Sequence, residues 1–255
     1  MLESKTKRTM AFSPGDFSFI PGVSQYSAGV TAEAGFSIQR VRFSRPISMQ
    51  EGYQRIAQFL ASVGRPTTAF CACELRIPEC FTEDTFKSFN SAYIRTLSEW
   101  GLIGEHGNPV ARSCVAPEID APAEASFHAF CYTVPAAAAP SFVVAGSGEV
   151  PEGHANYRDH IVCYGDTSTA GMATKANWVV DEMERRMTAL GATWNDATDI
   201  QVYTIHELKD ILCRVLAPRG VAAAGITWHF ARPPVIDLEY EMDCRQVHFN
   251  TIHKV

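Results

Sequence analysis

A single arginine interrupts the apolar segment NPVARSCVAPEID, which covers residues 108–120. Asparagine and proline mark a turn at its start, and the small and apolar residues around Arg112, within 111–115, are typical of a buried strand. A guanidinium stays charged in a protein, and a charge that is buried without a partner is costly. We therefore expect Arg112 to meet an anion, which is either a structural carboxylate or a bound ligand.

Two glutamates near the end of the chain form a second candidate. Glu239 and Glu241 lie in the segment VIDLEYEMDCRQV, residues 235–247, which is expected to be a strand. Residues two apart share one face of a strand, so the two carboxylates would lie side by side. On an exposed face this pair would mean nothing. On a buried face the repulsion would raise one pKa, which points to function.

Other residue types that could do chemistry are weaker candidates. Cys71 and Cys73 place two thiols on one strand face, but no second pair or nearby histidine completes a metal site, so packing is the better interpretation. His128, in the apolar segment ASFHAF, is either a hydrogen-bonded core residue or an acid–base group. Trp228 is either a core anchor or a cleft residue. The charged run EMERR, 182–186, is interpreted as a solvated helix face.

The elements that must position these residues follow the same order in both halves of the chain. Each half is expected to run strand–strand–helix–strand–helix–strand–strand, which a mixed sheet with two helices on one face can satisfy. In the first half the expected segments are 36–47 (hairpin-like), 48–64 (helix), 69–77 (strand), 82–101 (helix), 111–116 (strand) and 125–134 (strand). In the second half they are 141–151 (hairpin-like), 167–191 (helix), 199–205 (strand), 206–220 (helix), 224–234 (strand) and 235–247 (last strand).

The bulk composition limits the function class. The chain has 255 residues, a formal net charge of −6 and 46% hydrophobic residues, so it can bury a sizeable core and offers little to nucleic acid. No apolar run reaches the length of a membrane helix. The eight scattered cysteines are typical of reduced thiols in a cytoplasmic protein. A small Pro/Ala connector without charge, PAAAAPS, divides the expected domains 1–135 and 141–255.

Two motifs suggest a known family. The pattern F-x-x-F-N-x-x-Y at 86–93, followed by P-x-A-R-S-C-V at 109–115, resembles the RidA/YjgF family of enamine and imine deaminases. In the second half, 147–151, 202–208 and 236–243 resemble the family's Ser-Gly stretch, an inner strand and the closing strand. The resemblance implies two fused chorismate-mutase-like α/β barrel domains, sites in clefts between barrels, and no metal or organic cofactor. If barrels associate in threes, three chains are the smallest closed assembly, so a homotrimer is expected.

The resemblance assigns roles to particular residues of the first half. Arg112 matches the arginine that binds the substrate carboxylate, and its counterpart in the second half is Gly225. Asn90 matches the family's helix asparagine. The family's water-positioning glutamate falls near Ser126, which departs from the pattern. His128 would be the candidate to replace it.

The second half supplies what the first half lacks. Its match to the water-positioning glutamate is Glu239, with Glu241 two residues further on, and Ser147 and Gly148 match the Ser-Gly pair. These complementary losses suggest a composite site, in which Arg112 and Asn90 of one domain face Glu239 and Ser147 of another. The alternative is that one copy is only a scaffold and its charges form structural ion pairs.

The function that the resemblance implies is hydrolytic deamination of a small carboxylate-bearing enamine, imine or aminomuconate-type acid, with release of ammonia. Arg112 would hold the carboxylate by two parallel hydrogen bonds, and a glutamate such as Glu239 would orient or deprotonate the attacking water. Two alternatives stay open. One is a chorismate-hydrolysing enzyme of the same fold, and the other is a protein that binds metabolites without turnover.

Overall fold

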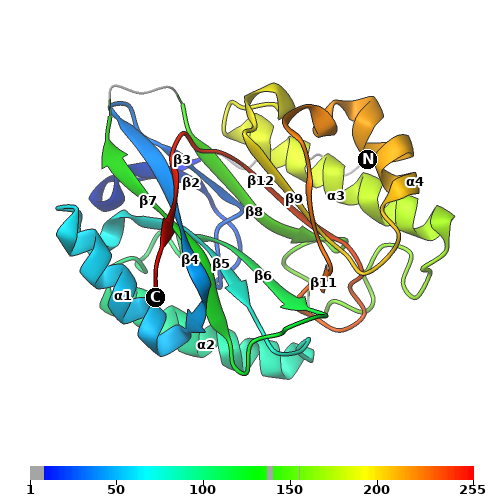
Figure 1. Ribbon diagram of the computed structural model, residues 1–255, viewed down its shortest axis with the longest axis horizontal. Helices are drawn as coiled ribbons and strands as arrows, with labels where there is room; N and C mark the ends of the chain where they lie inside the picture. The colour runs from blue at the N-terminus through cyan, green and yellow to red at the C-terminus, as the bar shows by residue number, and fades with distance from the viewer. Residues whose placement is uncertain (1–8, 137–139, 155) are drawn as a thin grey trace.

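The computed structural model describes residues 9–136, 140–154 and 156–255. Two β-sheets lie in the middle of the molecule, with α1 and α2 outside one sheet and α3 and α4 outside the other (Figure 1). The prediction of a mixed α/β fold with two helices beside each sheet is confirmed at this level. Of the predicted connector 135–141, residues 137–139 lie outside the described residues.

The three long helices begin where capping residues predict them. They are α1 (Met49–Ser62), α2 (Glu83–Glu99) and α3 (Thr169–Ala189). The hydroxyls of Ser48, Thr82 and Ser168 each accept a hydrogen bond from the backbone N–H three residues ahead, which satisfies a donor that the first turn leaves free. The predicted helices 48–64, 82–101 and 167–191 therefore agree with the structure within two residues at each end.

The first sheet has six strands in the order β11-β6-β5-β7-β4-β13. Their bounds are β4 (Phe36–Ser48), β5 (Phe70–Arg76), β6 (Ala111–Pro117), β7 (Ser126–Pro135), β11 (Ala231–Arg232) and β13 (Asn250–His253). β5 pairs with β6 in parallel, and β7 runs antiparallel to both β4 and β5. This sheet carries Arg112 in its middle.

The second sheet has seven strands in the order β1-β2-β3-β8-β12-β9-β10. Their bounds are β1 (Met10–Phe12), β2 (Phe17–Ile20), β3 (Gly29–Ala32), β8 (Phe142–Gly148), β9 (Asp199–Tyr203), β10 (Thr227–His229) and β12 (Glu241–Gln246). α3 packs on this sheet together with α4 (Lys209–Ile211), which continues as a π-helical turn, Leu212–Leu216.

Each sheet contains strands from both halves of the chain. β1, β2 and β3 come from the first half but extend the second sheet, while β11 and β13 come from the second half and form the edges of the first. The halves are therefore interlocked through backbone hydrogen bonds. The division into domains 1–135 and 141–255 stays a prediction.

Several predicted segments differ from the structure. Residues 36–47 form one long strand, β4, instead of a hairpin, because β4 pairs along its length with β7 and β13. The predicted helix 206–220 starts at Lys209 and tightens into a 3₁₀ turn at Ala217–Arg219, which contains Pro218. The predicted last strand, 235–247, begins only at Glu241, and β13 follows it.

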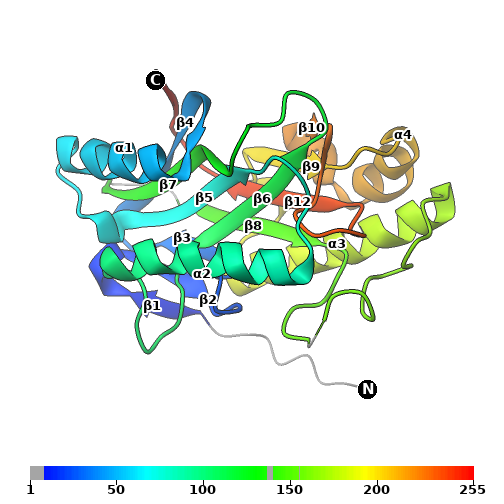
Figure 2. The ribbon, with the colours of Figure 1, turned by 90° about the horizontal axis from the view of Figure 1, so that it is seen from below.

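The sheets meet through a polar layer. Ser113 of β6 donates a hydrogen bond to Asp243 of β12 at 2.7 Å and accepts one from the backbone N–H of Gly146 in β8 at 3.1 Å. Figure 2 shows β6 beside β8 at this junction. One apolar core lies against α1 and α2 and also includes Phe19, Val30 and Val143 of the second sheet, whereas the other lies against α3. The contact between the sheets is therefore partly apolar and partly polar.

Candidate active site

Arg112 is buried, and its guanidinium is only partly bonded. The residue is 3% exposed, and its side chain reaches from β6 towards α2. Nη2 donates to Asn90 Oδ1 at 2.8 Å. Nε and Nη1 have no hydrogen-bond partner among the described residues. A buried donor without a partner costs about 1–3 kcal/mol, and more for a charged group, so the folded protein keeps these two N–H groups at a cost.

Aromatic rings surround the guanidinium where carboxylates would be expected. The centres of the Tyr26, Phe86, Phe89 and Tyr93 rings lie 5.3, 5.7, 5.6 and 4.7 Å from Arg112 Cζ. Ring faces attract a cation, but they do not neutralise its charge. Within the described chain, Arg112 forms no ion pair with an acidic side chain. The anionic partner that we expect for Arg112 is thus not a carboxylate of the described residues.

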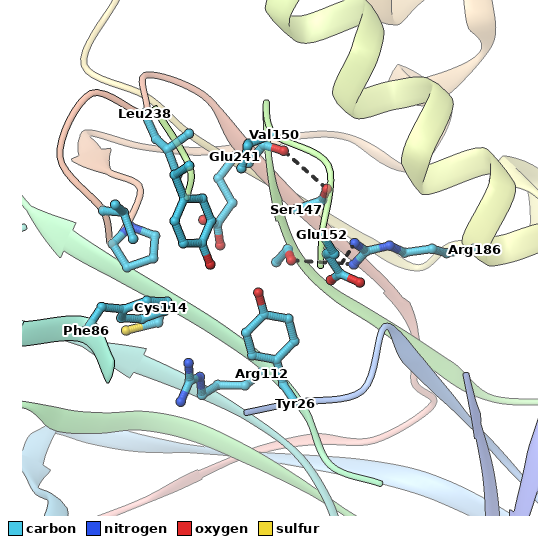
Figure 3. Close-up of a pocket in the computed structure, with 15 residues that line it drawn as sticks. Tyr26, Phe86, Arg112, Cys114, Ser147, Val150, Glu152, Arg186, Leu238 and Glu241 are labelled. Atoms are coloured by element: carbon cyan, nitrogen blue, oxygen red, sulfur yellow. Dashed lines mark hydrogen bonds and ion pairs between the residues drawn. The ribbon is translucent and has the colours of Figure 1, made fainter. Parts of the chain in front are cut away.

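An inner cavity opens beside Arg112 at the junction of the two sheets. It has a volume of about 50 Å³, and Figure 3 shows its walls. Arg112 lines it from the first half of the chain, while Ser147, Gly148 and Glu241 line it from the second half. Asn90 does not line the cavity but holds Arg112 from behind. The cavity therefore combines groups from both halves within one chain.

Glu241 is the acidic group with the most perturbed environment in this cavity. It is 4% exposed, and burial, followed by repulsion from Asp243 and Glu149, raises its pKa to about 8. A Cβ on Gly146 would lie 2.4 Å from Glu241 Oε1, so only glycine lets this carboxyl group lie against β8. A carboxyl group with this pKa is protonated at neutral pH and can both give and take a proton there.

Glu239 lies elsewhere, so within the described chain it does not pair with Arg112, and its predicted role stays a prediction. Its carboxylate contacts His206 Nε2 at 2.7 Å and does not line the inner cavity. The cause is a long-range contact. The backbone N–H groups of Glu239 and Tyr240 donate to the buried Glu149 carboxylate at 2.7 and 3.0 Å, so these residues stay outside β12. The two-residue alternation assumed for Glu239 and Glu241 therefore does not apply.

His128 and Trp228 also lie outside the inner cavity. His128 lines a separate groove of about 440 Å³ between the sheets, together with Arg40 and Arg42. Burial, and then the charge of Arg76, lower its pKa to about 3, so it is neutral at physiological pH. The Trp228 ring is 43% exposed on edge strand β10, and its Nε1 donates to the Thr204 carbonyl. Within this chain neither residue lines the cavity beside Arg112.

The inner cavity contains groups that the sequence did not reveal. Tyr26, Tyr157, Glu152 and Arg186 all line it. The interpretation of EMERR as a solvated helix face is wrong for Arg186, which is 1% exposed. The alternation of charged residues hides this burial, although Arg186 lies at helical spacing from the buried Met183 and Met187, which is a usable signal.

No metal centre is apparent in the parts of the chain that the structure describes. There, no group of three or more His, Cys, Asp or Glu side chains is placed to hold an ion. Cys71 and Cys73 are buried free thiols, and Cys73 Sγ lies 3.5 Å from the Tyr93 hydroxyl. Packing therefore describes them better than ligation. None of the described helices is both long and apolar enough to cross a membrane.

Two solved structures share some of this architecture. The YjgF gene product from E. coli is 15% identical, with a TM-score of 0.29, over 42% of this chain and 80% of that chain. Cyanuric acid hydrolase from A. caulinodans is 11% identical, with a TM-score of 0.41, over 83% of this chain and 66% of that chain. Both TM-scores are too low to support an argument about the barrels or the chemistry.

The sequence comparisons are much stronger. The chain is 47% identical over 239 residues to the 2-amino-5-chloromuconate deaminase of Comamonas testosteroni, which covers 92% of this chain and 95% of the relative. The family model described as 2-aminomuconate deaminase CnbZ matches residues 9–251. The match therefore spans both sheets and every residue of the inner cavity. The chain belongs to the 2-aminomuconate deaminase CnbZ family.

Proposed function

We propose that this chain hydrolytically deaminates a 2-aminomuconate-type acid and releases ammonia. Family membership and the relative named a 2-amino-5-chloromuconate deaminase support this activity. The observation that supports the site is Arg112, a buried cation whose Nε and Nη1 have no partner among the described residues. A substrate carboxylate that accepts from Nη1 or from Nε, together with the second hydrogen of Nη2, would balance the charge.

Arg112 is proposed to hold the carboxylate next to the carbon that carries the amino group. The planar guanidinium offers two parallel donors, which fix the orientation of a carboxylate as well as its position. Asn90 Oδ1 accepts a hydrogen bond from Nη2 and so fixes the position of the guanidinium. Such fixation removes part of the entropic barrier to attack by water.

Glu241 is proposed as the group that moves protons. Its proton goes to the carbon next to the amino-bearing carbon, as the electron pair of the carbon–carbon double bond forms the new C–H bond and an iminium results. The Glu241 carboxylate then takes a proton from water as the water oxygen bonds to the iminium carbon. The same proton passes to nitrogen, the C–N bond breaks, ammonia leaves, and the hydroxyl proton returns to Glu241 as the carbonyl forms.

The two glutamates give a direct test of this assignment. In an ammonia-release assay with 2-aminomuconate, Glu241→Gln should lower kcat by about 10²–10⁴, as expected for loss of a general acid–base group. Glu239→Gln is the matched control, because Glu239 lies on the same segment but pairs with His206, and it should keep activity within a few-fold. Loss of activity in Glu239→Gln alone would reverse the assignment.

The same assay separates this proposal from its rivals. A protein that only binds metabolites would release no ammonia, and neither would a chorismate-hydrolysing enzyme.

We further propose that the chain is a cytoplasmic homotrimer of two-barrel subunits. The two edge strands β10 and β13 support association, because Trp228 is 43% exposed and Phe249 and Ile252 are each 60% exposed beside them. All eight cysteines are free, which suits a reducing compartment. Sedimentation equilibrium should give three times 28.0 kDa, about 84 kDa, and a stable 28.0 kDa species would contradict the trimer.

A further inference from the structure

The inner cavity is too small for the whole of a six-carbon dicarboxylate. Its volume is about 50 Å³, and one water molecule alone needs roughly 10–15 Å³ on this measure. An outer chamber of about 340 Å³ adjoins it. A substrate whose first carboxylate lies at Arg112 must therefore extend towards the outer chamber, and its second carboxylate must find a partner on the way.

Four residues line both spaces and so define the passage between them. They are Tyr26, Phe86, Glu152 and Tyr157. Three are aromatic, which suits the flat conjugated chain of a muconate-type acid. The fourth, Glu152, is an acid and would repel a second carboxylate if it acted alone. Glu152 is not alone, because it is paired with an arginine.

Arg186 of α3 is that arginine, and its position is fixed. Its Nε donates to Glu182 Oε1 at 2.7 Å, and Nη1 donates to the Ala145 carbonyl at 3.1 Å. Its Nη2 donates to Glu152 Oε1 at 3.1 Å (Figure 3). Glu182 belongs to the same helix and Ala145 to β8, whereas Glu152 belongs to the irregular segment between β8 and α3. Glu152 is thus the partner that can most readily move away.

We propose that Arg186 binds the second carboxylate of a dicarboxylic substrate and that Glu152 occupies its place when no substrate is bound. This inference rests on the proposed function, in which Arg112 binds the first carboxylate. The two arginines line one cavity, so together they select a substrate with a carboxylate at each end. Glu152 then acts as an internal competitor that sets the affinity for the second carboxylate.

The exchange of one carboxylate for another is electrostatically inexpensive. Arg186 keeps an anionic partner at each stage, so no buried charge is left uncompensated. The Glu152 side chain is 17% exposed and also faces the outer chamber, where Lys87, His154 and Glu83 lie. The Glu83 carboxylate accepts a hydrogen bond from the backbone N–H of Tyr157 at 2.9 Å, and a displaced Glu152 would turn into the outer chamber, which Lys87 also lines.

A matched pair of unreactive ligands tests the proposal without turnover. trans,trans-Muconate and trans,trans-2,4-hexadienoate share one six-carbon diene and differ in the second carboxylate. Calorimetric titration should show that Glu152→Gln binds muconate about tenfold more tightly than the wild type does. The ratio of the hexadienoate Kd to the muconate Kd should rise by a similar factor. Glu118→Gln removes a glutamate that pairs with Arg232, so it controls for loss of an arginine-bound acid elsewhere.

The outcomes separate the two levels of the proposal. An unchanged or smaller Kd ratio in both Glu152→Gln and Glu152→Ala, with circular dichroism showing both variants folded, would overturn the second-carboxylate site. If one of the two variants folds poorly, the other decides the test. Arg186→Lys keeps the charge but loses the planar guanidinium, so it should lower the ratio of the hexadienoate Kd to the muconate Kd several-fold. If the wild type binds both ligands yet releases no ammonia from 2-aminomuconate, the deaminase proposal fails while the ligand site stands.

Discussion

Three buried arginines, Arg40 on β4, Arg112 on β6 and Arg245 on β12, differ in their partners. Arg245 contacts Glu74 at 2.6 Å and Asp243 at 2.6 Å, and Arg40 also contacts Glu74 at 2.6 Å. Arg112 is buried to the same degree but has no carboxylate partner among the described residues. The Arg245 guanidinium therefore joins strands through ion pairs, whereas Arg112 keeps two nitrogens without a hydrogen-bond partner among the described residues.

The difference distinguishes a structural role from a functional one. Glu74 lies on β5 and Arg245 on β12, so their ion pair joins the two sheets. Its two arginine partners hold the pKa of Glu74 well below its usual range, against the opposing effect of burial. Around Arg112 aromatic rings occupy the positions that acids occupy around Arg245. This contrast supports the proposal that the anion for Arg112 arrives with the substrate.

The largest expected effect is on activity at Arg112. Replacement by methionine removes two charge-assisted hydrogen bonds to the substrate, each worth roughly 1.5–3 kcal/mol. Arg112→Met should therefore lower kcat/KM for 2-aminomuconate by about 10²–10⁴ in the ammonia assay. Arg112→Lys should rescue little, because a lysine cannot form the two parallel bonds. Near-complete rescue by lysine would indicate that only the charge matters.

The next effect is on stability, and it should appear at Arg245 instead. Arg245→Met leaves Asp243 and Glu74 buried with a partner missing, which costs about 3–5 kcal/mol in comparable cases. Arg112→Met leaves no carboxylate without its partner, so it should change the free energy of unfolding by less than about 1 kcal/mol. Urea unfolding of both variants measures the contrast. Equal losses of stability would remove the distinction between the two arginines.

A third effect concerns the pH dependence of stability. The pKa of Glu241 is raised from 4.5 to about 8 in the folded chain, chiefly by burial. Between these pH values the folded state binds more protons than the unfolded state does. The free energy of unfolding therefore falls as pH rises, and this loss of stability is complete above pH 8. Glu241→Gln cannot ionise and should be about 4–5 kcal/mol more stable than the wild type at pH 8.5. At pH 4 the two should be equal, and a gain of the same size there would point to packing instead.

The smallest effect is the alkaline limb of activity. Proton donation needs Glu241 in its acid form, whose fraction falls about tenfold per pH unit above a pKa of about 8. kcat/KM should therefore decline with that slope between pH 9 and 10. A profile that stays flat to pH 10, with the enzyme still folded, would show that another group donates the proton.

The sequence predicted those parts of the structure that depend on local patterns. The helical segments 48–64, 82–101 and 167–191 were placed from the sequence, and the isolated charge in 111–115 singled out Arg112 before any coordinates. Glu241 was found as well, but the family resemblance gave the water-positioning role to Glu239, whose backbone N–H bonds to Glu149 in the structure. That contact joins residues 90 positions apart and leaves no local signal.

The remaining differences are also long-range. The placement of β1–β3 in the second sheet and of β13 in the first depends on pairing between the ends of the chain and distant strands, which periodicity does not report. The burial of Arg186 depends on the carbonyl of Ala145 and on the carboxylate of Glu152, which lie far from it in the sequence. The charged run around it resembles any solvated helix face.

A crystal structure of the chain with trans,trans-muconate tests the central claim most directly. The account predicts one carboxylate of the ligand within about 3 Å of Nε or of Nη1 of Arg112, the hydrogen-bond distance for charged partners. A complex in which those two atoms meet a carboxylate of the protein, or in which the ligand binds away from β6, would contradict it.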